Sequence, residues 1–142
     1  NLLNFFADAR GMASSTKSQR ISKVVDQCSL ESVLNKAISK LSRGFRQRVG
    51  MANVLMHEPE VLIMDEPTAG LDPNQVLEVR KTIKGLGKTI LLSTHILQEV
   101  PEVADRILLI NQGRLIFEGT PDEIKGEASL DGWFNRLTLD AA

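Results

Sequence analysis

Hydrophobic residues in the first 57 positions recur every three or four residues, a spacing typical of amphipathic helices. Two successive apolar faces comprise Leu2, Leu3, Phe5, Phe6 and Ala9, and then Ile21, Val24, Val25 and Cys28. A third helix is predicted to start at Ser42, because serine is a favoured N-cap residue. Its apolar stripe consists of Phe45, Val49, Ala52 and Met56. The first part of the chain is therefore predicted to be helical.

Short continuous apolar runs replace this periodicity from position 61 onward. They are VLIM (61–64), KTILLS (88–93) and RILLI (106–110). Runs of this kind are typical of strands that are buried on both faces of a parallel sheet. Helical patterns lie between them, so the alternation predicts parallel pairing with right-handed crossovers. The second part of the chain is therefore predicted to have an α/β fold.

The segments between and after these runs complete the predicted α/β region. The first connecting helix opens at Asp72-Pro73, since proline suits a first helical turn, and a shorter one contains Pro101. The sequence NQG (111–113) predicts a hairpin turn into a further strand, RLIFEG (114–119). Two helical segments are expected after it, at 121–125 and 130–137, with Trp133 and Phe134 as packing residues.

Composition excludes several classes of protein. The chain has 142 residues, 42% hydrophobic and 25% charged, as expected of one modest globular domain. A formal net charge of −1 gives no electrostatic case for nucleic acid or an anionic membrane, and Cys28 is the single cysteine. No apolar segment approaches the roughly 18 residues that span a bilayer. The opening residues lack an initiator methionine and resemble no secretory signal, so we expect a chain that begins within a longer protein.

Two adjacent carboxylates, Asp65 and Glu66, follow the first predicted strand directly. Functional sites of parallel sheets lie at the carboxyl ends of the strands. Because the strand ends here, both side chains could reach one cavity, where a divalent cation would relieve their repulsion. Taken alone, however, an Asp-Glu pair after a strand is more often a pair of solvated acids. The dipeptide therefore needs support from its neighbours.

Two other features would join it in a phosphate site. Ser42 and Gly44 lie at a predicted helix start, where exposed amides and the helix dipole favour anions. Glycine also lets a phosphate approach the backbone closely. His95 follows the second predicted strand, on the same sheet edge as the two acids. Each feature alone has an ordinary structural explanation, a capped helix or a structural histidine, but the combination is much more specific.

The combination resembles the ABC-type ATPases. LSRGFRQR (41–48), VLIMDEPTAGLDPNQ (61–75) and LLSTH (91–95) resemble the family's signature motif, Walker B motif, D-loop and switch histidine, in the family's order. The segments at 1–11 and 105–124 are also similar to their counterparts, so the resemblance covers nearly the whole chain. It implies a partial P-loop NTPase fold. Residues 1–58 would be the helical signature subdomain, and residues 59–142 the C-terminal part of the nucleotide-binding core, with an incomplete parallel sheet, a hairpin and helices.

The resemblance also implies cofactors, ATP and Mg²⁺, and a role for each motif residue. Asp65 would hold Mg²⁺, Glu66 would polarise the attacking water, and His95 would contact the γ-phosphate. Asp72 would lie at the interface between two subunits. The signature loop would close on ATP held by the opposite subunit; it comprises Leu41, Ser42, Arg43, Gly44 and Phe45. These roles match what phosphoryl transfer requires, namely positioning, a metal and charge stabilisation.

Two departures from the family pattern matter. The commonest signature reads LSGGQ, and here Arg43 and Phe45 replace its third and fifth residues, as in a bacterial exporter-like branch. The phosphate loop G-x-x-x-x-G-K-[ST] is absent, and in the family it lies upstream of the position of Asn1. We therefore expect this chain to be inactive alone. The central strand that carries that loop is missing too, so unpaired edges would favour rearrangement or a strand-exchanged homo-oligomer.

Three functions fit these features to different degrees. The first is the ATP-binding and ATP-hydrolysing subunit of an ABC-type membrane transporter, on the cytoplasmic face of the cell membrane. Its partners would be a membrane permease and a second ATP-binding subunit. The alternative is a non-catalytic module that pairs with a complete subunit, which the missing phosphate loop favours and the retained Glu66 and His95 disfavour. A role in DNA repair or translation is disfavoured by the near-neutral charge and the lack of heptads, so no nucleic-acid partner is expected.

The three arginines Arg43, Arg46 and Arg48 form a basic cluster with two possible explanations. Two of the three could simply be solvated, or Arg46 or Arg48 could act near phosphate or near the partner subunit.

Overall fold

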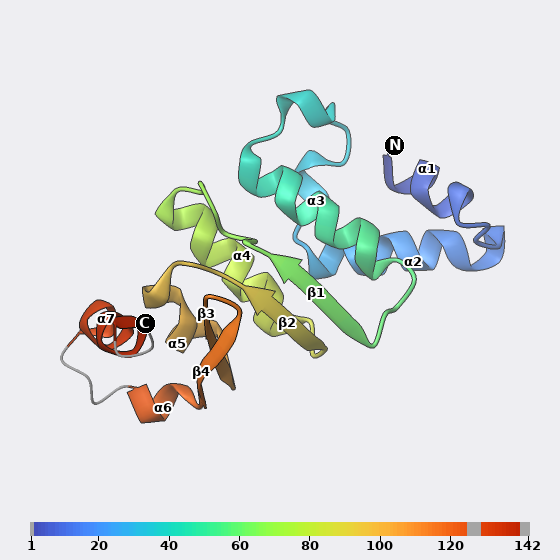
Figure 1. Cartoon of the computed structure of the whole chain (residues 1–142). Coiled ribbons are helices and arrows are strands. Elements are labelled where there is room, and N and C mark those ends of the chain that lie inside the picture. The colour runs from blue at the N-terminus through green and yellow to red at the C-terminus, as the bar shows by residue number, and fades with distance from the viewer. Residues whose placement is uncertain (1, 125–128, 140–142) are drawn as a thin grey trace. The chain divides into compact units, whose positions relative to one another are not determined.

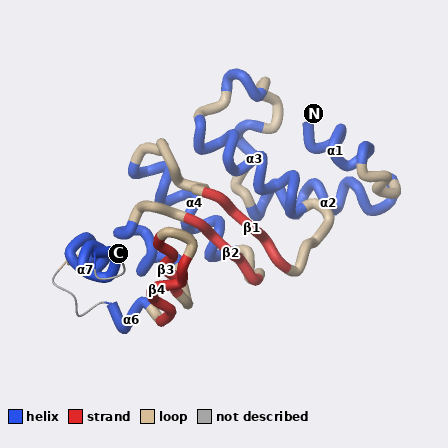
Figure 2. Tube along the Cα trace, viewed as in Figure 1, coloured by secondary structure: helices blue, strands red, loops and turns tan. Residues whose placement is uncertain are grey.

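The computed structural model describes residues 2–124 and 129–139 (Figure 1). Its residues divide into two compact units, Asn1–Ser93 and Thr94–Ala142, and each unit has its own hydrophobic cluster. Helices and strands alternate along the chain after residue 60 (Figure 2), which confirms the predicted α/β class.

The first unit opens with the three predicted helices. They are α1 (Leu2–Ala9), α2 (Ser14–Gln27) and α3 (Arg43–Leu55), and two short 3₁₀ turns, Glu31–Val33 and Ile38–Lys40, lie between α2 and α3. Their apolar faces meet in one core, with Val24, Cys28, Ala52 and Met56 completely buried. Burial raises the pKa of the Cys28 thiol to about 12, so this cysteine is a core residue and not a reactive group.

A β-α-β unit follows. The strands β1 (Val61–Asp65) and β2 (Thr89–Ser93) pair in parallel, with Val61 opposite Thr89 and Asp65 opposite Ser93, as predicted. The helix α4 (Pro73–Gly85) connects them and buries Val79 and Ile83 in the core.

The prediction that the apolar runs are buried on both faces is wrong for β1, for β2, where Leu91 is 56% exposed, and for the run at 106–110, where Leu108 and Ile110 are 51% and 65% exposed. Leu62 lies in the core and is only 3% exposed, whereas Val61 and Ile63 are 56% and 79% exposed. Successive side chains of a strand point to opposite faces. The core of this unit covers the Leu62 face, and the described part of the unit leaves the other face open.

The second unit contains the predicted hairpin and tail helices. A 3₁₀ turn (Leu97–Glu99) and α5 (Val100–Val103) precede the antiparallel strands β3 (Ile107–Asn111) and β4 (Arg114–Gly119), and α6 (Pro121–Ile124) and α7 (Leu130–Leu139) follow them. Gln112 and Gly113 both have positive φ, 48° and 76°, as a tight two-residue hairpin turn requires. The Trp133 ring packs edge-on against Phe117 at 5.0 Å, which confirms its packing role. Lys125, in the predicted 121–125 helix, lies outside the described residues.

The described strands form two separate two-stranded sheets. β2 pairs only with β1, and β3 pairs only with β4. The parallel pairing predicted from the strand-helix alternation therefore holds for β1 and β2 and does not extend to β3.

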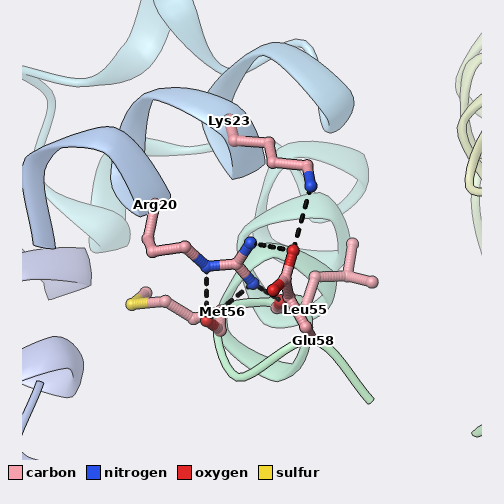
Figure 3. A network of polar contacts seen from close by, with 5 residues as sticks. All are labelled: Arg20, Lys23, Leu55, Met56 and Glu58. Carbon is pink, nitrogen blue, oxygen red and sulfur yellow. Dashed lines mark hydrogen bonds and ion pairs between the residues drawn. The ribbon is translucent and has the colours of Figure 1, made fainter. Parts of the chain in front are cut away.

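A polar network closes the carboxyl end of α3 (Figure 3). Arg20 of α2 donates two hydrogen bonds to the carbonyl oxygen of Met56, from Nε at 3.1 Å and from Nη2 at 3.0 Å, and one to that of Leu55 at 3.3 Å. The Glu58 carboxylate accepts a hydrogen bond from Lys23 at 3.0 Å and forms an ion pair with Arg20. Carbonyl groups at a helix end have no partner within the helix. Arg20 therefore satisfies two of these carbonyl groups and joins α2 to α3.

Acid should weaken this network. Hydrogen bonds from Lys23 and then from Arg20 lower the pKa of Glu58 below its ordinary value of 4.5. A depressed carboxylate pKa contributes stability above the unfolded pKa, and this contribution is lost as the pH falls through the folded pKa. We expect Glu58→Gln to lower the urea midpoint at neutral pH. The difference from the wild type should shrink below about pH 4.5. A pH-independent difference would contradict this assignment.

Candidate functional site

The carboxyl ends of β1 and β2 place Asp65 and Glu66 beside Ser93. The Asp65 carboxylate accepts a short hydrogen bond from Ser93 Oγ. The Glu66 N–H donates to the Ser93 carbonyl at 3.0 Å, which continues the parallel ladder one step beyond β1. Glu66 then turns into the left-handed region with φ 47°. Non-glycine residues rarely adopt this conformation. It ends the extended strand at Glu66, so the chain leaves the sheet abruptly and the two acids are not held on opposite faces of a strand.

A cavity of about 210 Å³ adjoins Asp65. It lies between α3 and β1 and is lined by side chains of both, among them Gln47, Met51 and Met64. Asp65 is exposed and Glu66 is half-buried. The described residues contain no group of three or more histidine, cysteine or acidic side chains that could enclose a metal ion. This donor set fits Mg²⁺, which is commonly held by one or two carboxylates together with water and substrate phosphates.

The signature residues form the amino-terminal end of α3. Ser42 is the N-cap, as predicted, and its hydroxyl accepts a hydrogen bond from the Phe45 N–H at 3.3 Å. Leu41 is buried before it, and Gly44 is buried in the first turn. The Gly44 N–H points away from the helix and donates to Gln75 Oε1 at 2.9 Å.

The D-loop segment lies against this end of α3. The Arg43 guanidinium packs directly over the α-carbon of Gly70, which has φ +68°. Asp72 is exposed and is the N-cap of α4, and its carboxylate accepts from the N–H groups of Asn74 and Gln75, both at 3.1 Å. The structure thus brings the signature residues and the D-loop together within one chain.

The other two arginines of the basic cluster have distinct positions. Arg46 is exposed and donates from Nη1 to the Leu41 carbonyl at 2.8 Å. Arg48 is buried, lies 4.4 Å above the centroid of the Phe45 ring, and donates to the Ser29 carbonyl at 3.3 Å. Arg48 is therefore a structural residue beneath the signature loop, and the solvated position that was one of its two predicted alternatives is wrong.

His95 belongs to the second unit and is exposed, two residues beyond the end of β2. The Thr94 hydroxyl beside it accepts from the Ile96 N–H at 3.1 Å and so fixes a local turn. The predicted closeness of His95 to Asp65 and Glu66 stays a prediction.

Sequence reasoning did not single out Ser93, Gly70 or Gln75. The in-register pairing of two parallel strands that both end at this edge could have identified Ser93 as the neighbour of Asp65. No signal in the sequence identifies the contact between Gly44 and Gln75, because a glutamine in the first turn of a helix is ordinary.

Comparison with known proteins supports the resemblance. The model of the ABC transporter family matches residues 2–69. The chain is 37% identical over 132 residues to the probable multidrug ABC transporter ATP-binding protein YbhF of Escherichia coli (strain K12), covering 91% of this chain and 23% of that protein. It is 38% identical over 125 residues to the Nod factor export ATP-binding protein I of Cupriavidus metallidurans, covering 86% of this chain and 41% of that protein.

A solved structure gives the same result. It is cbiO1 from Clostridium perfringens, described as part of the ABC transporter complex cbiONQ, which matches with a TM-score of 0.81 and 35% identity. The match covers 94% of this chain and 55% of that one, and the chain spans less than half the length of the two relatives above. The sequence motifs, the β-α-β unit and these likenesses agree, and the chain belongs to the ABC transporter ATP-binding family.

Proposed function

We propose that this chain is part of the ATP-hydrolysing subunit of an ABC-type membrane transporter. The observation that carries this proposal is the edge formed by β1 and β2, where Asp65 and Glu66 lie beside Ser93. Functional sites of parallel sheets lie at the carboxyl ends of the strands. Binding a metal ion and an attacking water would use both acids there.

Within this edge we assign different tasks to the two acids. Asp65 is exposed and would hold Mg²⁺ together with nucleotide phosphates and water. The metal would supply charge stabilisation for the phosphoryl group. Glu66 would accept a hydrogen bond from the attacking water and orient it, and its turn out of the strand supports this role. His95 would contact the γ-phosphate once the complete subunit is assembled.

The signature end of α3 would bind ATP held by a second ATP-binding subunit. The N-cap at Ser42, the buried Gly44 and the following turn support this role, since helix amides bind phosphate well. Leu41, Arg43 and Phe45 would shape the loop, and Asp72 would face the same interface. ATP would therefore contact both subunits.

The helical part of the chain, residues 1–58, would contact a membrane permease, and residues 59–142 would belong to the nucleotide-binding core. A cavity of about 470 Å³ lined largely by apolar side chains of the helical part, including Leu2 and Ile38, supports this contact. No helix among the described residues is both long and apolar enough to cross a membrane. Through its proposed contact with the permease, the chain would act at the inner face of the membrane.

The separate sheets support a further element of the proposal. The outer edge of β2 has no strand partner among the described residues, and an open edge can pair with another chain. We propose that the isolated chain exchanges strands in a homo-oligomer. Light scattering should give at least twice the monomer mass, and a stable monomer would contradict this proposal.

The proposed need for a phosphate loop from other sequence is tested with the purified chain and Mg-ATP. The sequence contains no phosphate loop, the element that makes most contacts to nucleotide phosphates in this family. We expect weak or no binding in calorimetry and no release of phosphate above background. Hydrolysis that Glu66→Gln abolishes would contradict the proposed dependence on a phosphate loop supplied by other sequence.

A further inference from the structure

The amide of Gly44 has an unusual partner. The next two amides of α3 are satisfied locally, since Phe45 donates to the Ser42 hydroxyl and Arg46 to the Ser42 carbonyl. Gly44 instead donates to a side chain 31 positions later, the Oε1 atom of Gln75, at 2.9 Å in a partly buried contact. The first amides of a helix have no partner within the helix and are the groups that bind anions. Gln75 therefore occupies one of the donors that a phosphate would need.

The fit around this contact is close. A Cβ atom added to Gly44 would lie 2.7 Å from Gln75 Oε1 and 3.1 Å from its Cβ and Cδ atoms. Gln75 thus fills the space that a side chain at position 44 would occupy. In the reciprocal contact, Arg43 of the signature loop fills the space that a side chain at position 70 would occupy. Each of the two segments, 43–44 and 70–75, supplies one glycine and one long polar side chain. The signature loop and the D-loop segment therefore pack closely against each other.

We infer that Gln75 is an internal competitor that holds the phosphate-binding amide of the signature loop until nucleotide displaces it. The inference rests on the proposed function, because it concerns the same anion site. The amide oxygen of glutamine is a neutral acceptor, and a phosphate oxygen forms the stronger, charge-assisted hydrogen bond. Phosphate can therefore replace Gln75 at Gly44.

Gln75 also contacts Asp72, through its main chain. The backbone N–H of Gln75 donates to the Asp72 carboxylate at 3.1 Å, in the cap of α4. Gln75 is accordingly a positioning residue, whose side chain holds the Gly44 amide and whose main chain caps α4 at Asp72.

Two variants with side chains close to glutamine in size distinguish competition with phosphate from structural support of the signature loop. Gln75→Met keeps the packing of the side chain and removes the acceptor, and Gln75→Glu keeps an acceptor and adds negative charge. Lys81→Met is the control, since it places methionine on an exposed position of the same helix. The full 142-residue chain, labelled with ¹⁵N, is titrated with inorganic phosphate. The amide signals of Gly44 and Phe45 are followed, together with the hydrogen exchange rate of Gly44.

Competition predicts opposite effects of the two variants. Gln75→Met should bind phosphate about three- to tenfold more tightly than the wild type, as expected from the loss of one competing hydrogen bond, and the Gly44 amide should exchange faster. Gln75→Glu should bind phosphate more weakly, and Lys81→Met should match the wild type. Equal or weaker binding by Gln75→Met overturns the inference and leaves the proposed anion site in place. No phosphate response in any of the four proteins contradicts the anion site itself, and the competitor role with it.

Discussion

Replacing Glu66 by glutamine should slow ATP hydrolysis by about two to four orders of magnitude in the complete subunit to which we assign this chain. Glutamine has nearly the same size but cannot accept a proton from the attacking water. The main-chain turn that places residue 66 is set by its N–H bond to the Ser93 carbonyl, which the substitution keeps. ATP binding should therefore be retained, with the loss confined to kcat.

Two further variants make this result specific. Asp65→Asn should raise the Mg²⁺ concentration needed for half-maximal hydrolysis, because it removes the charge proposed to hold the metal. Glu60→Gln changes an exposed glutamate just before β1 and should leave kcat unchanged. A Glu66→Gln subunit that hydrolyses ATP at more than half the normal rate would exclude Glu66 as the group that activates water.

Removing the buried guanidinium with Arg48→Ala should lower the free energy of unfolding by about 2–4 kcal/mol. The substitution loses the cation–π contact with Phe45 and the hydrogen bond to the Ser29 carbonyl, and it leaves a cavity beneath the signature loop. The unfolding free energy of the 142-residue chain is measured by urea denaturation.

Arg46→Ala is the matched control for this experiment. It removes the same side chain from the same helix, but Arg46 is exposed and makes one hydrogen bond to Leu41, so we expect a loss of about 1 kcal/mol or less. Arg48→Met, which fills most of the space without a charge, should lie between the two variants. Equal losses for Arg46→Ala and Arg48→Ala would show that burial of Arg48 contributes nothing.

Local signals predicted much of the first unit. Ser42 was expected as an N-cap and is one, because its hydroxyl satisfies an amide of α3. The runs at 61–64 and 88–93 were expected as parallel strands, since a helix of sufficient length connects them. In the second unit, the chain reversal at NQG was expected because Gly113 adopts positive φ without steric cost. These features depend on neighbours in the sequence and on spacing, which a single sequence contains.

Other features depend on contacts between distant segments. The burial of Arg48 follows from the packing of α3 on the turn at Ser29, and nothing in the spacing of three arginines separates it from Arg46. The exposure of Ile63 depends on which elements cover the sheet, and an apolar run is the same whether one face is covered or both. The bond between Gly44 and Gln75 likewise needs the relative positions of α3 and α4.

The sequence of the coding DNA upstream of Asn1 is the most direct test of whether this chain belongs to a working ATP-driven transport subunit. We predict an open reading frame that continues upstream and encodes G-x-x-x-x-G-K-[ST], followed by a glutamine-bearing loop, before the codon for Asn1. A start codon or a stop codon close to Asn1 would contradict the proposal. The chain would then act without a phosphate loop of its own, as a module that pairs with a complete ATP-binding subunit.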